Sequence, residues 1–151
     1  MARLEYRLLD EEAEYPVLYE YDRVEKKEIA LRFACEYFVK DKRVYALASC
    51  ATEPDVYVIY VTEANDEKAG VEARGTSHWN GVRLEIRQFG EEWMEYPLLH
   101  TRDFADLYDV LLYLQSDYVT IGDKEWVRSS TEVDEDRKLY VLYVKEDEKI
   151  E

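Results

Sequence analysis

Apolar and polar residues alternate along residues 2–8 and again along residues 82–87. A period of two is typical of a half-buried β-strand, because successive side chains of a strand point to opposite faces. In both segments the polar positions hold an arginine, a glutamate and an arginine. The pattern therefore predicts two strands, each with an apolar face inward and an Arg-Glu-Arg row outward.

A Tyr-Pro pair follows each alternating segment, and a stretch with helical spacing comes next. Proline suits the first residue of a strand or an edge strand, so we expect short strands at residues 17–21 and 98–100. Asp22 and Asp103 are the expected N-caps of two helices, each with an acidic residue three positions further on. The apolar residues at helical spacing are Ala30, Phe33, Ala34, Tyr37 and Phe38 in the first helix, and Phe104, Leu107, Tyr108, Leu111, Leu114 and Tyr118 in the second.

Two further strands are expected after each helix. They cover roughly residues 44–50 and 56–62 in the first case, and 125–130 and 139–144 in the second. The last strand of each series is apolar on both faces. This composition is typical of a central strand in a sheet that is covered on both sides.

The two series of elements match each other in order along the chain. The matching blocks are residues 3–7 (RLEYR) with 83–87 (RLEIR), 11–12 with 91–92, 14–18 (EYPVL) with 95–99 (EYPLL), and 57–63 (YVIYVTE) with 140–146 (YVLYVKE). The offset between them stays between 80 and 83 residues. Four collinear matches are hard to attribute to composition, so we infer a tandem duplication.

The sequence thus predicts one α+β domain over residues 1–151, with a mainly antiparallel sheet and two helices. Its internal repeats, residues 3–63 and 83–146, are expected to be β-β-α-β-β units around a pseudo-two-fold axis. A unit of about 60–65 residues is marginal for a core of its own, so we expect the two units to share one core. The connector, residues 64–82, is expected to add an extra hairpin strand, because Asn80-Gly81 precedes the second alternating segment.

Composition adds little to this architecture but excludes some classes of protein. Apolar residues make up 47% of the chain, which is enough for a packed core. There is no apolar run of about 18 residues that could span a membrane, and the N-terminal residues do not resemble a signal peptide. The two cysteines, Cys35 and Cys50, do not indicate a disulfide framework. We therefore expect a cytoplasmic protein without membrane contacts.

Charge is the strongest compositional signal. The chain has 35 acidic and 20 basic residues and a net charge of −15. Such a surface would repel a phosphate backbone, so direct nucleic-acid binding is not expected. The charge favours solubility, and it also suits a basic protein partner or the mimicry of a polyanion. The oligomeric state is left open.

No motif in the chain predicts a catalytic, cofactor-binding or metal-ligating residue, and we do not expect an enzyme. His78 and His100 are the only histidines, and the five glycines are too dispersed for a phosphate-binding loop. The acidic run at residues 132–136 favours a solvated hairpin tip, with loosely bound calcium or magnesium as the alternative.

Six residues are candidates for an interaction surface or a groove: Glu14, Tyr15, Glu95, Tyr96, Trp79 and Trp93. The Glu-Tyr pairs occur once in each repeat. They favour a structural turn, with a groove between the repeats as the alternative. The two tryptophans have no counterpart in the first repeat, and they would form a binding surface if they are exposed.

Two functions remain open. The first is a non-enzymatic interaction or regulatory protein that uses an acidic, tyrosine-rich surface against a basic protein partner. The second is a small-molecule binding domain with a groove between the repeats. The tandem strand–helix–strand–strand units resemble, in arrangement, the effector-binding domains of multidrug-responsive transcription activators. This resemblance implies an amphipathic cation as ligand, met by tyrosine rings and a buried glutamate.

Overall fold

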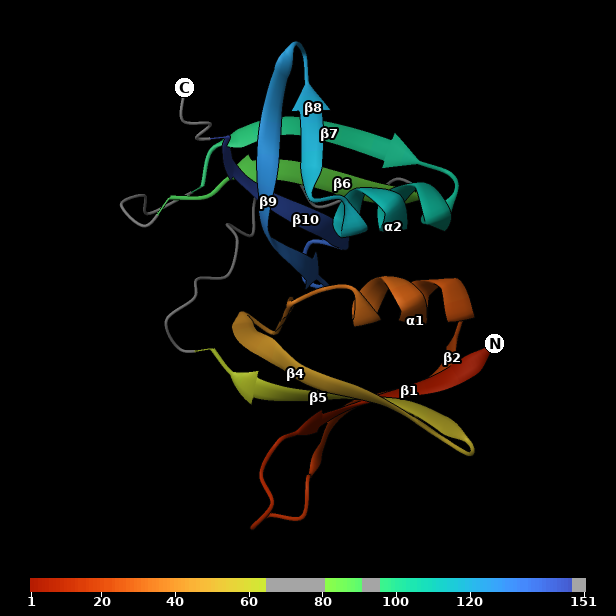
Figure 1. Ribbon diagram of the computed structural model, residues 1–151. Coiled ribbons are helices and arrows are strands. Elements are labelled where there is room, and N and C mark those ends of the chain that lie inside the picture. The colour runs from red at the N-terminus through yellow and green to blue at the C-terminus, as the bar shows by residue number, and fades with distance from the viewer. Residues whose placement is uncertain (65–80, 91–95, 148–151) are drawn as a thin grey trace.

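A computed structural model describes residues 1–64, 81–90 and 96–147 of the chain. Residues 1–64 form what we call the first half (Figure 1). Its elements are, in order, β1 (Ala2–Leu8), β2 (Val17–Val24), α1 (Lys26–Phe33), β3 (Tyr37–Lys40), β4 (Arg43–Glu53) and β5 (Val56–Glu63).

The described residues from 81 to 147 form the second half, and their elements follow in the same order. They are β6 (Val82–Gln88), β7 (Leu98–Phe104), α2 (Leu107–Gln115), β8 (Tyr118–Ile121), β9 (Lys124–Asp134) and β10 (Leu139–Glu146). Each half therefore has one strand more than the β-β-α-β-β unit expected from the sequence.

The prediction of a mainly antiparallel sheet is wrong. The described strands form one mixed ten-stranded sheet in the order β2-β1-β5-β4-β3-β9-β10-β6-β7, with β8 attached to β9. Three pairs in it are parallel: β1 with β5, β6 with β10, and β3 with β9. Alternation identifies a strand but not its neighbour. The first and last strands of each half become neighbours after a connection through a helix, and such a connection leaves them parallel.

The strand registers of the two halves agree with the sequence alignment. Leu4 lies opposite Tyr57 in the first half, and Leu84 lies opposite Tyr140 in the second. β5 and β10 are central strands, each between two neighbours, as their apolar faces predicted. The two halves share topology and register; the duplication that explains them stays a prediction.

Both helices begin later and end earlier than the sequence predicted. Asp22 and Asp103 lie in β2 and β7, and the N-caps are Glu25 and Asp106, which are again 81 residues apart. The predicted helical stripes also ran too far. Tyr37, Phe38 and Tyr118 lie in the short strands β3 and β8, because residues at a spacing of three or four can belong to a helix and the strand after it.

In the part of the chain that the structure describes, one strand pair joins the sheets of the two halves. β3 pairs with the end of β9, with Phe38 opposite Val133. A pseudo-two-fold axis would require the equivalent pair between β8 and β4. Among the described residues, β8 pairs with β9 alone. The expected symmetry is therefore not met at the junction.

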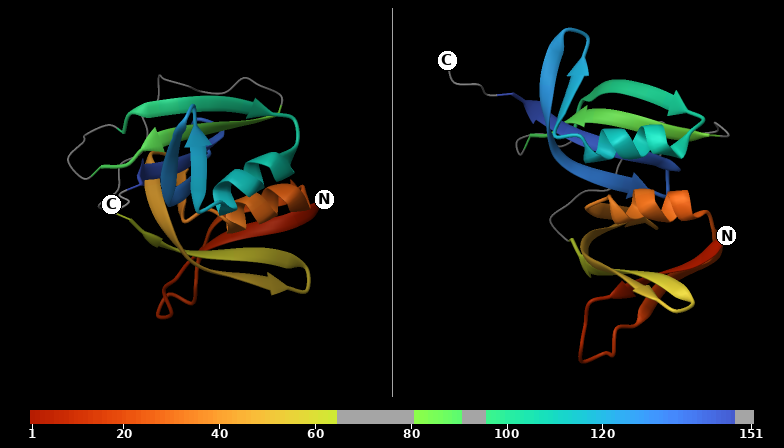
Figure 2. Two further views of the ribbon diagram at one scale, coloured as in Figure 1. Left: turned by 45° about the horizontal axis from the view of Figure 1, so that its top comes forward. Right: turned by 45° about the vertical axis from the view of Figure 1, so that its right-hand side comes forward.

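The main hydrophobic core contains residues of both halves, including the fully buried Leu4, Leu31, Leu84 and Leu142. The two helices lie side by side at the centre of the molecule (Figure 2). A smaller cluster on the other face of β10 contains Leu139, Val141 and Tyr143. No described helix is long and apolar enough to cross a membrane.

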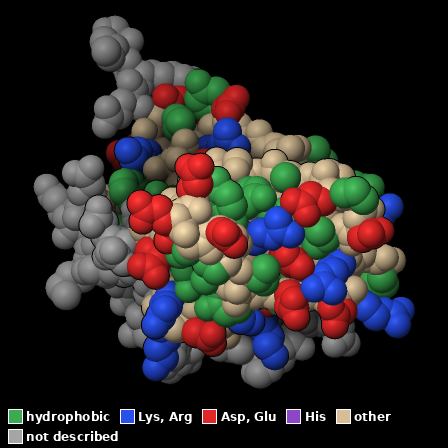
Figure 3. All heavy atoms as spheres, turned by 90° about the horizontal axis from the view of Figure 1, so that it is seen from below, with side chains coloured by type: hydrophobic (Ala, Val, Ile, Leu, Met, Phe, Trp, Pro, Cys, Tyr) green, Lys and Arg blue, Asp and Glu red, His purple; other side chains and the backbone are tan. Residues whose placement is uncertain are grey.

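The Arg-Glu-Arg rows differ between the halves. In the first half, Arg3 and Arg7 bind Glu5 and lie beside further acidic residues on an open sheet face, where both charges are interspersed (Figure 3). In the second half, Glu85 is 3% exposed and binds both Arg87 and Arg137. Glu5 is also buried, so the arginines cover the central glutamate of each row.

The acidic run at residues 132–136 is a hairpin tip only in part: Glu135 and Asp136 lie in the turn after β9, and Asp136 is exposed. Glu132 and Asp134 belong to β9 and are buried, and Asp134 binds the buried Arg137 at 2.7 Å. Within the described ranges no group of His, Cys, Asp and Glu could hold a metal ion. The extra hairpin strand predicted before Val82 lies outside the described residues.

Candidate interaction surface

The outward side of α2 carries large apolar residues besides the exposed Asp109 and Gln115, which is unusual for a surface helix. Seven of its nine residues are leucine, valine or tyrosine, and a helix that is apolar on all sides is normally buried. Tyr108 and Leu112 are nevertheless 52% and 64% exposed. The helix is held in place by the side chain of its N-cap, Asp106, which accepts a hydrogen bond from the Tyr108 backbone at 2.9 Å.

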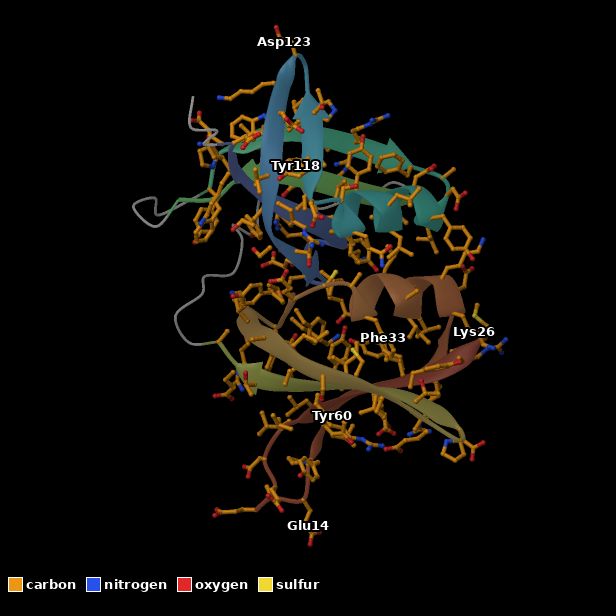
Figure 4. The ribbon with its side chains drawn as sticks, viewed as in Figure 1. Glu14, Lys26, Phe33, Tyr60, Tyr118 and Asp123 are labelled. Atoms are coloured by element: carbon orange, nitrogen blue, oxygen red, sulfur yellow. The ribbon has the colours of Figure 1, made fainter. Side chains whose placement is uncertain are left out.

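β8 follows α2 and carries a further large exposed residue. Tyr118 is 57% exposed and follows α2 after a short turn, and Figure 4 shows it on the strand that leads to the hairpin tip at Asp123. Val119 points the other way and is buried in the core. We define the α2–β8 face as Tyr108, Leu112, Tyr113, Tyr118 and the groove beside them.

The groove has a volume of about 550 Å³. One wall contains Arg102, whose guanidinium donates to the Tyr113 hydroxyl at 2.6 Å and stacks on Phe104. The groove is lined by residues from β7, α2 and β8: Arg102, Phe104, Asp109, Leu112, Tyr113, Ser116, Tyr118, Val119 and Thr120. It combines apolar walls with a few polar groups, as binding sites commonly do.

One backbone edge of β8 also faces this side. The Arg128 amide donates to the Asp117 carbonyl. Because every second residue of an antiparallel strand bonds to its partner, this bond shows which residues of β8 bond to β9. Val119 and Ile121 then bond to β9, and the backbone groups of Tyr118 and Thr120 point away from it. Within the described part of the chain no strand pairs with this second edge. Unpaired edges of this kind are templates for a further strand.

No protein-family model, curated protein or solved structure matches this chain. Neither these comparisons nor the described residues give positive evidence of catalysis.

A second, smaller cleft lies at the junction of the halves, with a volume of about 150 Å³. Glu36 and Tyr37 line it from the first half, and Phe89, Tyr96, Ser129, Ser130, Glu132 and Tyr143 line it from the second. Tyr143 donates to the buried Glu132 at 3.3 Å. Burial raises the pKa of the Glu36 carboxyl, and the nearby Arg128 guanidinium partly offsets this effect. Burial, together with the Glu132 charge, raises the pKa of the Tyr143 hydroxyl.

The candidate residues from the sequence lie in different places. Glu14 and Tyr15 are exposed in the loop between β1 and β2, at the lower end of the molecule (Figure 4). Both have a left-handed backbone, which is consistent with a turn. Tyr96 lines the junction cleft. Trp79, Trp93 and Glu95 lie outside the described residues, so a role for the six candidates stays a prediction.

Sequence reasoning missed the α2–β8 face, although a signal was present. At an offset of 81 residues, Lys26 and Lys27 of α1 align with Leu107 and Tyr108 of α2. A lysine replaced by an apolar residue at an equivalent surface position indicates a face with another use. The amphipathic stripe alone did not show this, because Tyr108 was assigned to the core.

Proposed function

We propose that this protein is a non-enzymatic interaction protein that binds a basic protein partner through the α2–β8 face. The observation that carries the proposal is the exposure of Leu112 and Tyr118, which line one groove, together with the exposure of Tyr108 on the same helix. Grouped exposed apolar residues mark interaction sites, and tyrosine is frequent among the residues that dominate binding.

Charge supports a basic partner. The net charge of −15 attracts a positively charged protein over long distances and accelerates its association. The groove itself contains Asp109 together with Arg102, and the neighbouring Asp117 is exposed and ion-paired with Arg128. A cytosolic location, expected from the sequence, belongs to the same proposal.

Site-specific photo-crosslinking tests this proposal. A photoreactive phenylalanine analogue is placed at Tyr118 in one variant and at Glu14 in another, and each is irradiated in cells. We expect Tyr118 to capture a small set of basic proteins, and their capture should decrease when a lysate is irradiated at high salt. Glu14 is the matched control at the other end of the molecule. The same captured proteins at both positions, or only acidic proteins at Tyr118, would contradict the proposal.

The junction cleft supports a second candidate function, the binding of a small organic cation. Two carboxylates and four aromatic rings line one cleft of about 150 Å³, and such rings attract quaternary ammonium ions. Choline and its uncharged isostere 3,3-dimethylbutan-1-ol provide a matched test. Choline alone should raise the melting temperature, and the Glu132→Gln variant should lose the effect. An equal response to both compounds, or no response to either, would exclude this function.

A further inference from the structure

We propose that the partner adds a strand to the edge of β8 that pairs with no described strand, parallel to it, with an apolar side chain inserted in the groove beside α2. This inference rests on the proposed function and specifies how the partner is bound. Its basis is that the chain already makes the equivalent contact once, at the junction of its halves.

The template is the end of β9 on β3. The two strands are parallel, with Tyr37, Phe38 and Val39 opposite Glu132, Val133 and Asp134. The Glu135 amide donates to the Val39 carbonyl at 2.9 Å. The first half thus binds an extended segment along the open side of its short strand, next to the end of its helix.

In the second half, β8 presents the equivalent backbone groups, and no described segment pairs with them. At the offset of 81, Tyr37 and Val39 correspond to Tyr118 and Thr120. The hydrogen bond from the Leu47 amide to the Glu36 carbonyl corresponds to that from Arg128 to Asp117. The two short strands are therefore anchored to their hairpin partners in the same register, and the Thr120 carbonyl occupies the place of the Val39 carbonyl.

Burial differs between the two halves. Leu31 of α1 is 0% exposed, whereas the equivalent Leu112 of α2 is 64% exposed. The residue opposite Phe38 of β3 is Val133, and it belongs to the main core. An added residue opposite Val119 would enter the groove of about 550 Å³. Val119 is smaller than its counterpart Phe38, so this residue can be larger than valine.

The partner segment is therefore extended, with a large apolar residue flanked by basic ones. Residues on either side of the inserted one point to the opposite face of the sheet. One of them lies opposite Tyr118, whose exposed ring can receive a lysine or arginine. Strand addition of this kind obtains affinity from backbone hydrogen bonds and specificity from alternate side chains.

A designed octapeptide tests the mode of binding. It follows residues 129–136 of this chain, with the acidic residues replaced by lysine and the valine by leucine: Ser-Ser-Thr-Lys-Leu-Lys-Lys-Lys, blocked at both ends. In this register the seventh amide takes the place of the Glu135 amide, and the sixth points away from β8. N-methylation of the seventh residue removes the hydrogen bond, and N-methylation of the sixth is the matched control.

Titration of the ¹⁵N-labelled protein provides the readout. We expect saturable shifts at Tyr118–Ile121 and Leu112. Methylation of the seventh residue should weaken binding by about ten-fold, the order expected for one lost hydrogen bond. Methylation of the sixth should have little effect. Replacing the leucine by alanine should weaken binding, and so should replacing the lysines by glutamate.

Each other outcome contradicts a specific step. If the peptide binds at the α2–β8 face and both methylated forms bind equally, strand addition is wrong and the proposed function stands. If shifts lie elsewhere, or if the glutamate peptide binds as well as the lysine peptide, the proposed function also fails. If the protein alone forms a dimer that Tyr118→Lys dissociates, the occupant is a second copy of this chain. If no peptide binds while crosslinking at Tyr118 succeeds, strand addition is excluded and the proposed function stands.

Discussion

The two halves of this protein have the same elements in the same order, but they use the space beside the helix differently. In the first half, the end of β9 covers the short strand β3, and Leu31 is fully buried. In the second half, β8 has no such cover among the described strands, and Leu112 is exposed. The comparison teaches that equivalent surfaces can differ in cover: a strand pairs with the short-strand edge in the first half, and no described strand does so in the second.

An arginine–tyrosine pair shows the same difference. In the first half, Arg32 of α1 lies over the ring of Tyr21 in β2 at 5.1 Å. In the second half the two residue types are exchanged, and Arg102 of β7 lies over Tyr113 of α2 at 5.7 Å. Both arrangements keep the contact between helix and strand.

Only the first arrangement is part of the junction. Arg32 also donates to Glu135, which comes from the second half, and Glu135 accepts hydrogen bonds from Tyr21 and an ion-pair contact from Lys40. Arg102 instead lines the open groove.

The largest expected effect concerns the buried charges of the second half. Arg137→Met leaves Glu85 and Asp134 without one of their ion pairs at 2.8 Å and 2.7 Å. Removing one partner of a buried pair typically costs about 3–5 kcal/mol of stability. Arg3→Met in the exposed row of the first half should cost about 1 kcal/mol or less. Urea unfolding of both variants measures the difference, and equal losses would contradict the contrast between the two rows.

Truncation of the paired leucines tests the comparison most simply. Leu31→Ala removes a fully buried side chain and should cost about 2–5 kcal/mol. Leu112→Ala should change the free energy of unfolding by less than about 0.5 kcal/mol, because the side chain is mostly exposed. Urea unfolding measures both values. A large loss for Leu112→Ala in the isolated protein would show that this side chain is already covered.

Exchanging the arginine and tyrosine within each half should give a smaller but asymmetric effect. The double variant Arg102→Tyr with Tyr113→Arg keeps the ring contact and should lose about 1 kcal/mol or less. The double variant Tyr21→Arg with Arg32→Tyr also disrupts the contacts with Glu135, so it should lose more. Thermal and urea unfolding of both double variants provide the test. Equal losses would mean that the first pair contributes nothing to the junction.

The smallest expected effect is a change in pH dependence. The pKa of Glu36 is raised by burial, so the folded state holds this proton at pH values where the unfolded chain has lost it. Its contribution to stability is therefore present at low pH and decreases as the pH rises through the ordinary value of 4.5 and the raised value. Glu36→Gln should remove this decrease, whereas Asp117→Asn at the equivalent position should not. Identical pH profiles for both variants would contradict the assignment.

Local patterns in the sequence predicted much of the fold. The alternation at residues 2–8 and 82–87 and the matching blocks of tyrosine and valine indicated strands that the structure contains. They failed where a decision depends on distant residues. Tyr37 and Tyr118 continue a helical spacing although the chain has already turned, and nothing in a local pattern shows that β1 and β5 lie side by side and parallel.

The exposure of Leu112 could not be predicted for a similar reason, although Tyr108 in place of a lysine was a signal for the surface. Leu31 and Leu112 are the same residue at equivalent positions, and only the tertiary packing makes one buried and the other exposed. Glu132 and Asp134 of the acidic run were misjudged because charged residues are usually solvated. Here the basic residue that accompanies Asp134, Arg137, is buried with it.

Amide hydrogen exchange of the free protein tests the central claim, that the α2–β8 face is the uncovered equivalent of the β3 edge. The amides of Tyr37 and Val39 lie between two strands and should exchange slowly. Those of Tyr118 and Thr120 face an open edge and should exchange at least about ten-fold faster. Equal protection of the two pairs would show that the β8 edge is already covered and would contradict the account.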